Sequence, residues 1–288
     1  MSCARPSKTL NFATLLAHFR HNMKRLISQQ SIAQSVTGVS AEEIAAHFNL
    51  LPERYFAQTV ETDIALHLAM VNRLLHNISA ADSLGSLRPV IEWRDAPERG
   101  CSIVHIVTWD RAGLFFKLAG ALSVAGLNIL SARITTRNDH IALDSFEVTE
   151  PGHGIVQDES ARELFARTVE SALVANKDLS SAIAAQAGRF APPAATLQAP
   201  VIEVYQEISS PRLIVEVHAA DRFGLLYRVG RVITEHGFNL AAARVHTERG
   251  LAIDSFHLES ADPRTIDSAR LTALRDDLVA ATSPGASA

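Results

Sequence analysis

The sequence has little of what several classes of protein require. Only two of its 288 residues are cysteine, Cys3 and Cys101, so no disulfide framework supports the fold and the reducing cytoplasm is the expected compartment. It contains no apolar run of about 18 residues that could span a membrane, and no N-terminal signal peptide. The formal net charge of -4 also argues against a basic nucleic-acid-binding face. We therefore expect neither a membrane nor a nucleic acid as partner.

Familiar catalytic motifs are missing too. The chain has no G-x-x-x-x-G-K-[ST] phosphate loop, no G-x-S-x-G turn and no H-E-x-x-H pair of metal ligands. His47, His67 and His76 lie on helical patterns, where a packed or solvated histidine is far more common than a metal ligand. The sequence thus predicts no catalytic residue, no metal site and no cofactor, although a nucleophile and a base from distant positions would leave no motif.

What is present suits an ordinary globular protein of more than one domain. Apolar residues make up 47% and charged residues 20% of the chain, enough to build real cores. The first 90 residues favour helices, because apolar side chains recur at helical spacing over Thr9 to Gln30 and over Thr62 to Ile78. Between them, Ser40 and Glu43 form a capping box that predicts the start of another helix.

The main feature of the sequence is an internal repeat. The segment from Asp110 to Val148 is repeated, with similar residues, from Asp221 to Leu258. The two copies are offset by 111 residues, and by 110 at Asp144 and Asp254, so the second copy has one residue fewer in its hairpin turn. A single deletion confined to a turn is typical of a duplicated domain.

Each copy predicts the order strand, helix, strand, strand, helix. A further strand would complete a ferredoxin-like βαββαβ fold. For the first copy we expect that strand at Val201 to Tyr205, whereas the second copy ends with a helix over Thr265 to Thr282 and lacks its last strand. The fold class is therefore α+β: a helical segment over residues 1–90, a first domain over 91–206 and a second domain over 207–288.

The repeated D-R-x-G-L loop is the best candidate for a binding site. Its glycine permits a sharp turn, and the free N–H groups of the following helix can hold a carboxylate. Its aspartate can bind an ammonium group, or can simply cap the helix. A site with both properties suits an α-amino acid. The predicted ligand-binding residues are Asp110, Arg111, Gly113, Leu114 and Asn128 in the first copy, and Asp221, Arg222, Gly224, Leu225 and Asn239 in the second.

Other repeated polar residues have simpler interpretations. Asn128 and Asn239 follow a helix-ending glycine, so they either line the ligand site or serve the turn. Arg133 and Asp144 lie on neighbouring strands of the first hairpin, and Arg244 and Asp254 on those of the second. For both pairs we expect a cross-strand ion pair.

The succession of motifs in each copy resembles the ACT domain. These motifs are D-R-x-G-L-[FL], then G-[LF]-N-[IL], A-R-[IV]-x-T and [LI]-D-S-F. ACT domains are small ferredoxin-like modules that bind amino acids and regulate enzymes. The tandem pair, preceded by the sequence L-P-E-R-Y-F, resembles more narrowly the C-terminal region of the bifunctional PII uridylyltransferase/uridylyl-removing enzymes, which are nucleotidyltransferases.

That resemblance implies a glutamine-sensing regulatory protein of nitrogen metabolism. The implied partners are a PII-type signalling protein or a separate catalytic subunit, and a second copy of this chain. ACT sheets often pair side by side, so an interface between the two domains or between two chains would complete each ligand site. The chain has no His-Asp dipeptide and no D-x-D metal pair, so we expect the sensing part of the enzyme without its catalytic domains. Two alternatives stay open: a fragment that retains uridylyltransferase activity, and an ACT scaffold that only dimerises and binds no ligand.

Overall fold

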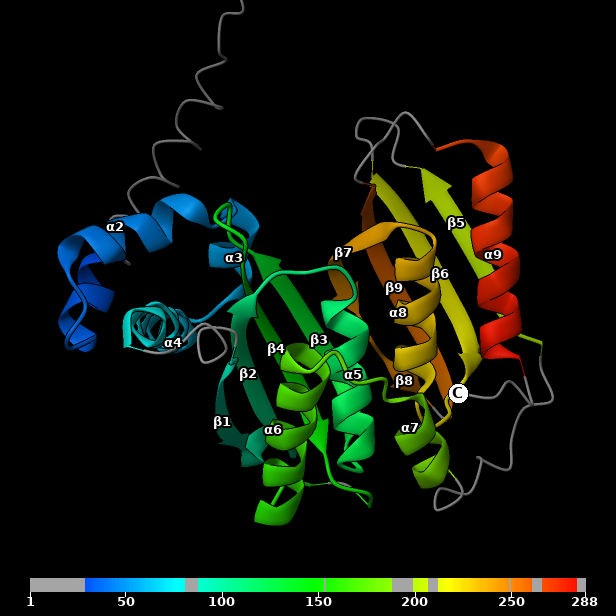
Figure 1. The fold of residues 1–288 in the computed structure, drawn as a ribbon, viewed down its shortest axis with the longest axis horizontal. Helices are drawn as coiled ribbons and strands as arrows, with labels where there is room; N and C mark the ends of the chain where they lie inside the picture. The colour runs from blue at the N-terminus through cyan, green and yellow to red at the C-terminus, as the bar shows by residue number, and fades with distance from the viewer. Residues whose placement is uncertain are drawn as a thin grey trace, which may run out of the picture. The chain divides into compact units, whose positions relative to one another are not determined.

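A computed structural model describes residues 29–80, 88–152, 154–187, 199–206, 212–248, 250–260 and 266–283 (Figure 1). The chain forms two compact units, residues 1–72 and residues 73–288. The helix predicted over Thr9 to Gln30 lies almost wholly outside the described residues. Within the described ranges, no helix is both long and apolar enough to cross a membrane.

The first unit is helical, as predicted. Its helices are α2 (Ala41–Leu50), α3 (Glu53–Gln58) and α4 (Glu61–Ala80), the last of which continues past the boundary of the unit. The capping box at the start of α2 is present, because the Glu43 amide donates to the Ser40 hydroxyl and the Ser40 amide donates to the Glu43 carboxylate. Two histidines are packed in the interior: His47 is fully buried, and His67 lies with Nδ1 2.8 Å from the Tyr55 hydroxyl.

The second unit contains two antiparallel sheets with helices packed against them (Figure 1). The first sheet has the strand order β1-β2-β4-β3. Together with two helices it forms what we call the first module. Its elements are β1 (Val90–Ala96), β2 (Cys101–Trp109), α5 (Leu114–Val124), β3 (Asn128–Thr136), β4 (Ile141–Thr149) and α6 (Glu159–Val174), with the short 3-10 turn η2 (Pro97–Arg99) after β1.

The second sheet has the strand order β5-β6-β9-β7, with a short β8 paired to β9, and with its helices forms the second module. Its elements are β5 (Val201–Gln206), β6 (Arg212–Ala220), α8 (Leu225–Glu235), β7 (Phe238–Arg244), β8 (Thr247–Glu248), β9 (Leu251–Ser260) and α9 (Ser268–Thr282). Between the modules lies α7 (Ser180–Ala187), a helix that the sequence did not predict. The α+β class, the N-terminal helices and the two ferredoxin-like sheets are thus confirmed.

One strand was assigned to the wrong sheet. The segment Val201 to Tyr205 does not complete the first sheet; as β5 it pairs with β6, where Val201 lies opposite His218. The corresponding place in the first sheet belongs to β1, which pairs with β2. Each module therefore takes its fourth strand from the segment just before it, because a strand close in sequence costs less loop-closure entropy than one beyond a helix. As expected, the described residues contain no strand after α9.

The two modules share one hydrophobic core and meet through equivalent helices. In Figure 1, α5 and α8 lie side by side. The Phe116 and Tyr227 rings, which are equivalent in the repeat, meet edge to face with centroids 5.5 Å apart. Glycines permit this close approach: a Cβ on Gly120 would lie 2.7 Å from the Tyr227 ring, and one on Gly230 would lie 2.9 Å from Phe115. The repeat is therefore folded as an intramolecular pair.

Candidate functional site

The two repeated loops have the backbone that their glycines predict, but their aspartates do not cap the helices. Gly113 and Gly224 have left-handed φ angles of 76° and 72° and stand directly before α5 and α8, and no side chain caps either helix. The Arg111 amide and the Thr136 hydroxyl instead lie close enough to the Asp110 carboxylate to lower its pKa in part. The helix-cap interpretation of the aspartates is therefore wrong, because a turn separates them from the helix and the hairpin supplies donors.

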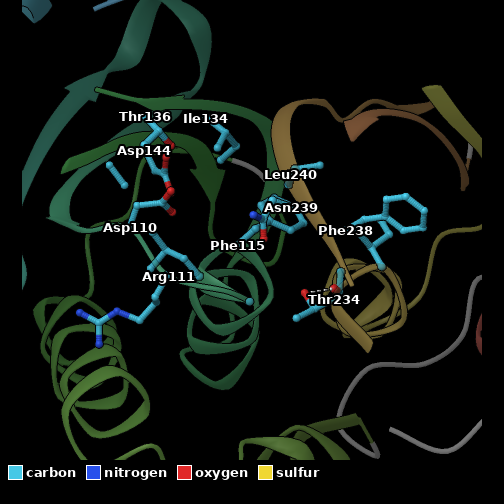
Figure 2. Close-up of a pocket in the computed structure, with 15 residues that line it drawn as sticks. Asp110, Arg111, Phe115, Ile134, Thr136, Asp144, Thr234, Phe238, Asn239 and Leu240 are labelled. Atoms are coloured by element: carbon cyan, nitrogen blue, oxygen red, sulfur yellow. Dashed lines mark hydrogen bonds between the residues drawn. The ribbon is translucent and has the colours of Figure 1, made fainter. Parts of the chain in front are cut away.

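A pocket lies where the first loop meets the second module (Figure 2). The space in it that no protein atom fills is about 510 Å³ and is partly open to solvent. Polar groups at one end come from the first module, an apolar middle comes from both, and polar groups at the other end come from α8 and β7. The first module contributes Asp110, Arg111, Gly113, Leu114, Phe115, Ile134, Thr136, Ala142 and Asp144, and the second contributes Gly230, Ile233, Thr234, Phe238, Asn239 and Leu240.

The pocket brings together part of the predicted site. Of the predicted residues it is lined by Asp110, Arg111, Gly113, Leu114 and Asn239. The loop of one copy thus faces the asparagine of the other. The remaining predicted residues do not line this pocket and occupy the equivalent positions of the other copy; these are Asn128, Asp221, Arg222, Gly224 and Leu225.

Sequence reasoning missed the residues that close the pocket. Thr136 and Asp144 come from the hairpin of the first module, and Thr234, Phe238 and Leu240 from the second module. The hairpin residues had a usable signal, since both recur in the repeat. The residues of the second module had none, because nothing local in the sequence says which parts of the two modules face one another.

The loop arginines brace the fold. Arg111 Nη1 donates to the Leu173 carbonyl at 2.8 Å, at the end of α6, and Figure 2 shows its guanidinium turned away from the carboxylates of the pocket. In the second module, Arg222 Nη2 donates to the carbonyls of Thr282 and Ser283 at the end of α9. Each arginine thus ties its loop to the last helix of its own module.

Asp144 is the most unusual side chain of the pocket. It is only 1% exposed, and within the described part of the chain neither carboxylate oxygen has a hydrogen-bond partner of ordinary geometry. Burial and the nearby charge of Asp110 raise the pKa of Asp144 well above its usual value, and the Thr135 amide offsets only part of this rise. Burial likewise raises the pKa of Asp110. The pocket therefore holds two adjacent acids that resist ionising together.

The predicted cross-strand ion pair of Arg133 with Asp144 is wrong. Arg133 lies opposite Ser145 in the sheet, and its guanidinium is 3.6 Å from the Glu147 carboxylate. Asp144 lies opposite Ile134 instead. Because successive residues of a strand face opposite sides of the sheet, this shift of one residue puts the arginine and Asp144 on different faces.

The second hairpin has the same register. Arg244 lies opposite Ser255, so the predicted pair of Arg244 with Asp254 is wrong for the same reason. The buried Asp254 accepts a hydrogen bond from the His246 amide at 3.1 Å. Burial, together with the nearby Asp221, raises the pKa of Asp254 to about 7, although the His246 amide lowers it in part.

The two loops differ in what covers them. A Cβ on Gly224 would lie 2.7 Å from Ile183 Cγ2, so the fully buried Ile183 of α7 packs directly on the second loop. At Gly113 the three atoms nearest to such a Cβ all belong to Phe116 of the following helix. The hydroxyl of Tyr227 also donates to Asp178, just before α7, at 2.9 Å. The connection between the modules therefore covers the second loop and leaves the first facing the pocket.

Comparisons with known proteins agree with this architecture. Residues 213–274, which form most of the second module, match the ACT domain family. The bifunctional uridylyltransferase/uridylyl-removing enzyme of Rhodospirillum rubrum is 34% identical over 240 residues, covering 82% of this chain and 25% of that protein. The enzyme of the same name from Erythrobacter litoralis is 25% identical over 270 residues, covering 93% of this chain and 28% of that protein.

The matches cover most of this chain but only a small part of each relative. A third relative of the same name, from Novosphingobium aromaticivorans, is 27% identical over 269 residues and covers 92% of this chain. The chain spans only about a quarter of the length of these curated relatives. The chain is thus an ACT-containing protein that resembles, along most of its length, the C-terminal regulatory part of the bifunctional uridylyltransferase/uridylyl-removing enzymes.

Proposed function

We propose that this chain is an amino-acid sensor whose ligand binds in the pocket between the two modules, and that glutamine is the ligand. The observation that supports the proposal is the composition of the pocket. An acidic end, the start of α5, an apolar middle and the Asn239 amide lie along one cavity. The resemblance to uridylyltransferase/uridylyl-removing enzymes supports glutamine in particular.

The groups of an amino acid match those of the pocket one by one. Its ammonium group would lie at the Asp110 carboxylate. Its carboxylate would accept hydrogen bonds from the Phe115 and Phe116 amides in the first turn of α5. The neighbouring amides of Leu114 and Lys117 already donate to the carbonyls of Arg111 and Gly113. The side-chain amide of glutamine would then extend along the apolar wall toward Asn239 and Thr234, which offer a donor and an acceptor in the second module.

A ligand in this position would act on the relation between the modules. It would touch the loop of one module and the strand of the other, and so favour the arrangement in which both contact it. Such a ligand shifts a partner only by its difference in affinity for two arrangements. We propose that the partner is a uridylyltransferase-type catalytic unit in the cytoplasm, acting on a PII-type protein, and that chains pair through their sheets.

The proposal includes one ligand per chain. Ile183 of α7 packs on the second loop, whereas the atoms nearest to a Cβ on Gly113 belong to Phe116 of the helix that follows the first loop. The Asp110 loop would therefore bind, and the Asp221 loop would serve as its structural counterpart. The residues equivalent to the ligand-binding ones in the other copy would then contact no ligand; they are Asn128, Asp221, Arg222, Gly224 and Leu225.

Isothermal titration of the full chain with each of the twenty amino acids tests this function. We expect saturable binding of glutamine with one site per chain, lost in Asp110→Ala and kept in the matched variant Asp221→Ala. If another amino acid binds instead and its binding responds to the two variants in the same way, the proposed site is correct and the proposed ligand is not. No heat with any amino acid, in a folded protein, would support the scaffold alternative instead.

A further inference from the structure

The buried carboxyl of Asp144 is not explained by the proposed contacts of the ligand. It lines the pocket beside Asp110, is 1% exposed, and both of its oxygens lack a hydrogen-bond partner of ordinary geometry among the described residues. Arg111 is the only cation among the residues that line the pocket, and its guanidinium is engaged with the Leu173 and Trp109 carbonyls. A buried acceptor without a donor is costly, so its presence in a cavity calls for a partner that arrives with the ligand.

We propose that Asp110 and Asp144 hold one proton between them in the empty pocket and exchange it for the ammonium group of the ligand, so that binding releases a proton. This inference rests on the proposed function, because it concerns the same pocket. The O–H bond of the Asp144 carboxyl breaks, its proton passes to solvent, and the ligand ammonium replaces that positive charge. No other bond changes, and no further reactant is needed.

The surroundings of the pair favour this exchange. Two carboxylates without a cation between them cannot both ionise at low cost, and they titrate as a pair. Burial and the charge of Asp110 raise the pKa of Asp144. His140 and Arg111 are the neighbouring basic side chains that lower the pKa of Asp110, and the rise caused by burial outweighs both. The residues that the second module adds to the pocket carry no charge; they are Gly230, Ile233, Thr234, Phe238, Asn239 and Leu240.

The exchange defines the class of ligand. The ligand must carry a compact cation, such as a primary ammonium group, whereas the same molecule without its amino group would leave the proton in place and gain nothing from the pair.

The affinity for the ligand must then depend on pH. Below the pKa of the pair the proton has to be displaced, so affinity rises with pH by up to about tenfold per pH unit, and the slope disappears once the empty pair is ionised.

The test is titration of the full chain with L-glutamine, and with any other amino acid that binds, between pH 5 and pH 8. Each titration is repeated in two buffers that both hold the pH but differ in ionisation heat, which reports the protons released. The pairs are acetate and piperazine near pH 5, phosphate and MES near pH 6, and phosphate and HEPES at pH 7 to 8. We expect release of up to one proton per ligand at the acidic end of the range, together with the rise in affinity. Glutaramate, which is glutamine without its amino group, should bind at least tenfold more weakly at pH 8.

Two matched variants complete the design. Asp144→Asn keeps the shape of the side chain and removes its proton, so it should abolish the proton release, flatten the pH dependence and bind more weakly than wild type at pH 8. The equivalent variant in the second module, Asp254→Asn, should retain the wild-type slope. If Asp144→Asn fails to fold, the carboxyl signals of 13C-aspartate in the wild-type protein replace it, and one of them should ionise when ligand is added at pH 6.

The outcomes separate this inference from the function on which it rests. Binding of an amino acid without proton release, or with an unchanged slope in Asp144→Asn, overturns the exchange and leaves the sensor intact. Equal binding of glutaramate does the same. If none of the twenty amino acids binds at any pH, both the sensor and the exchange are overturned.

Discussion

Replacing the buried Asp254 by asparagine should make the protein more stable at neutral pH. In the folded protein the pKa of Asp254 is raised from 3.8 to about 7, mainly by burial. Between these values the folded state keeps a proton that the unfolded chain loses, so stability falls as pH rises through this window. The rise in pKa corresponds to about 4 kcal/mol of unfolding free energy, since one unit is worth about 1.4 kcal/mol.

Asparagine removes this penalty and keeps the fold's contacts. Its side-chain oxygen can still accept the hydrogen bond that the His246 amide gives to Asp254. The difference in unfolding free energy between Asp254→Asn and wild type should therefore grow by up to about 4 kcal/mol from pH 4 to pH 8. The side chain is 2% exposed, so solvent screening reduces this value little.

Urea unfolding of both proteins at several pH values measures this difference. Taking the difference cancels the contributions of acids that do not act on Asp254, including Asp144 and Asp110, whereas the coupling of Asp254 to Asp221 stays in it. Glu163→Gln is the control, because the Glu163 side chain is 69% exposed and, within the described ranges, its ion pair is with Arg167 on the same helix, so the curve of this variant should run parallel to that of wild type. A difference between Asp254→Asn and wild type that stays constant with pH would refute the assignment of a buried, proton-holding carboxyl.

Two further predictions concern the contact between the modules. In Gly230→Ala the added methyl group would lie 2.9 Å from Phe115 and Phe116, so thermal unfolding should show a loss of about 1–2 kcal/mol even after the gain in helix propensity; unchanged stability would contradict the close helix contact. In Tyr227→Phe the hydroxyl that donates to Asp178 is lost, so urea unfolding should show a loss of about 1 kcal/mol, and none if α7 is not held there.

Much of the fold could be predicted because the sequence contains an internal repeat. The repeat fixed the order of elements within each copy, and the two loop glycines have the left-handed φ angles that their positions indicated. Edge strands were harder. The segment at Val201 to Tyr205 has the same alternating pattern whichever sheet it joins, so the pattern alone did not reveal that it pairs with β6.

The site could be predicted from the sequence only where its residues belong to a local motif. The Asp110 loop could be identified from its motif, and Asn239 from its place in the repeat. Asp144 was misread as an ion-pair partner, since a shift of one residue in strand register decides which face a side chain occupies. The closure of the second loop by Ile183 could not be foreseen, because α7 lies outside the repeat and has no counterpart in it.

The central claim is that the ligand binds between the first loop and the second module. Its most direct test is titration of the amino acid that binds wild type, glutamine by our proposal, into two variants at equivalent positions, Asn239→Ala and Asn128→Ala. Both asparagines are exposed near the start of their strands, so neither change should disturb the fold. The account predicts that Asn239→Ala loses binding and that Asn128→Ala keeps one site per chain. Full binding by Asn239→Ala, or loss in Asn128→Ala alone, would contradict it.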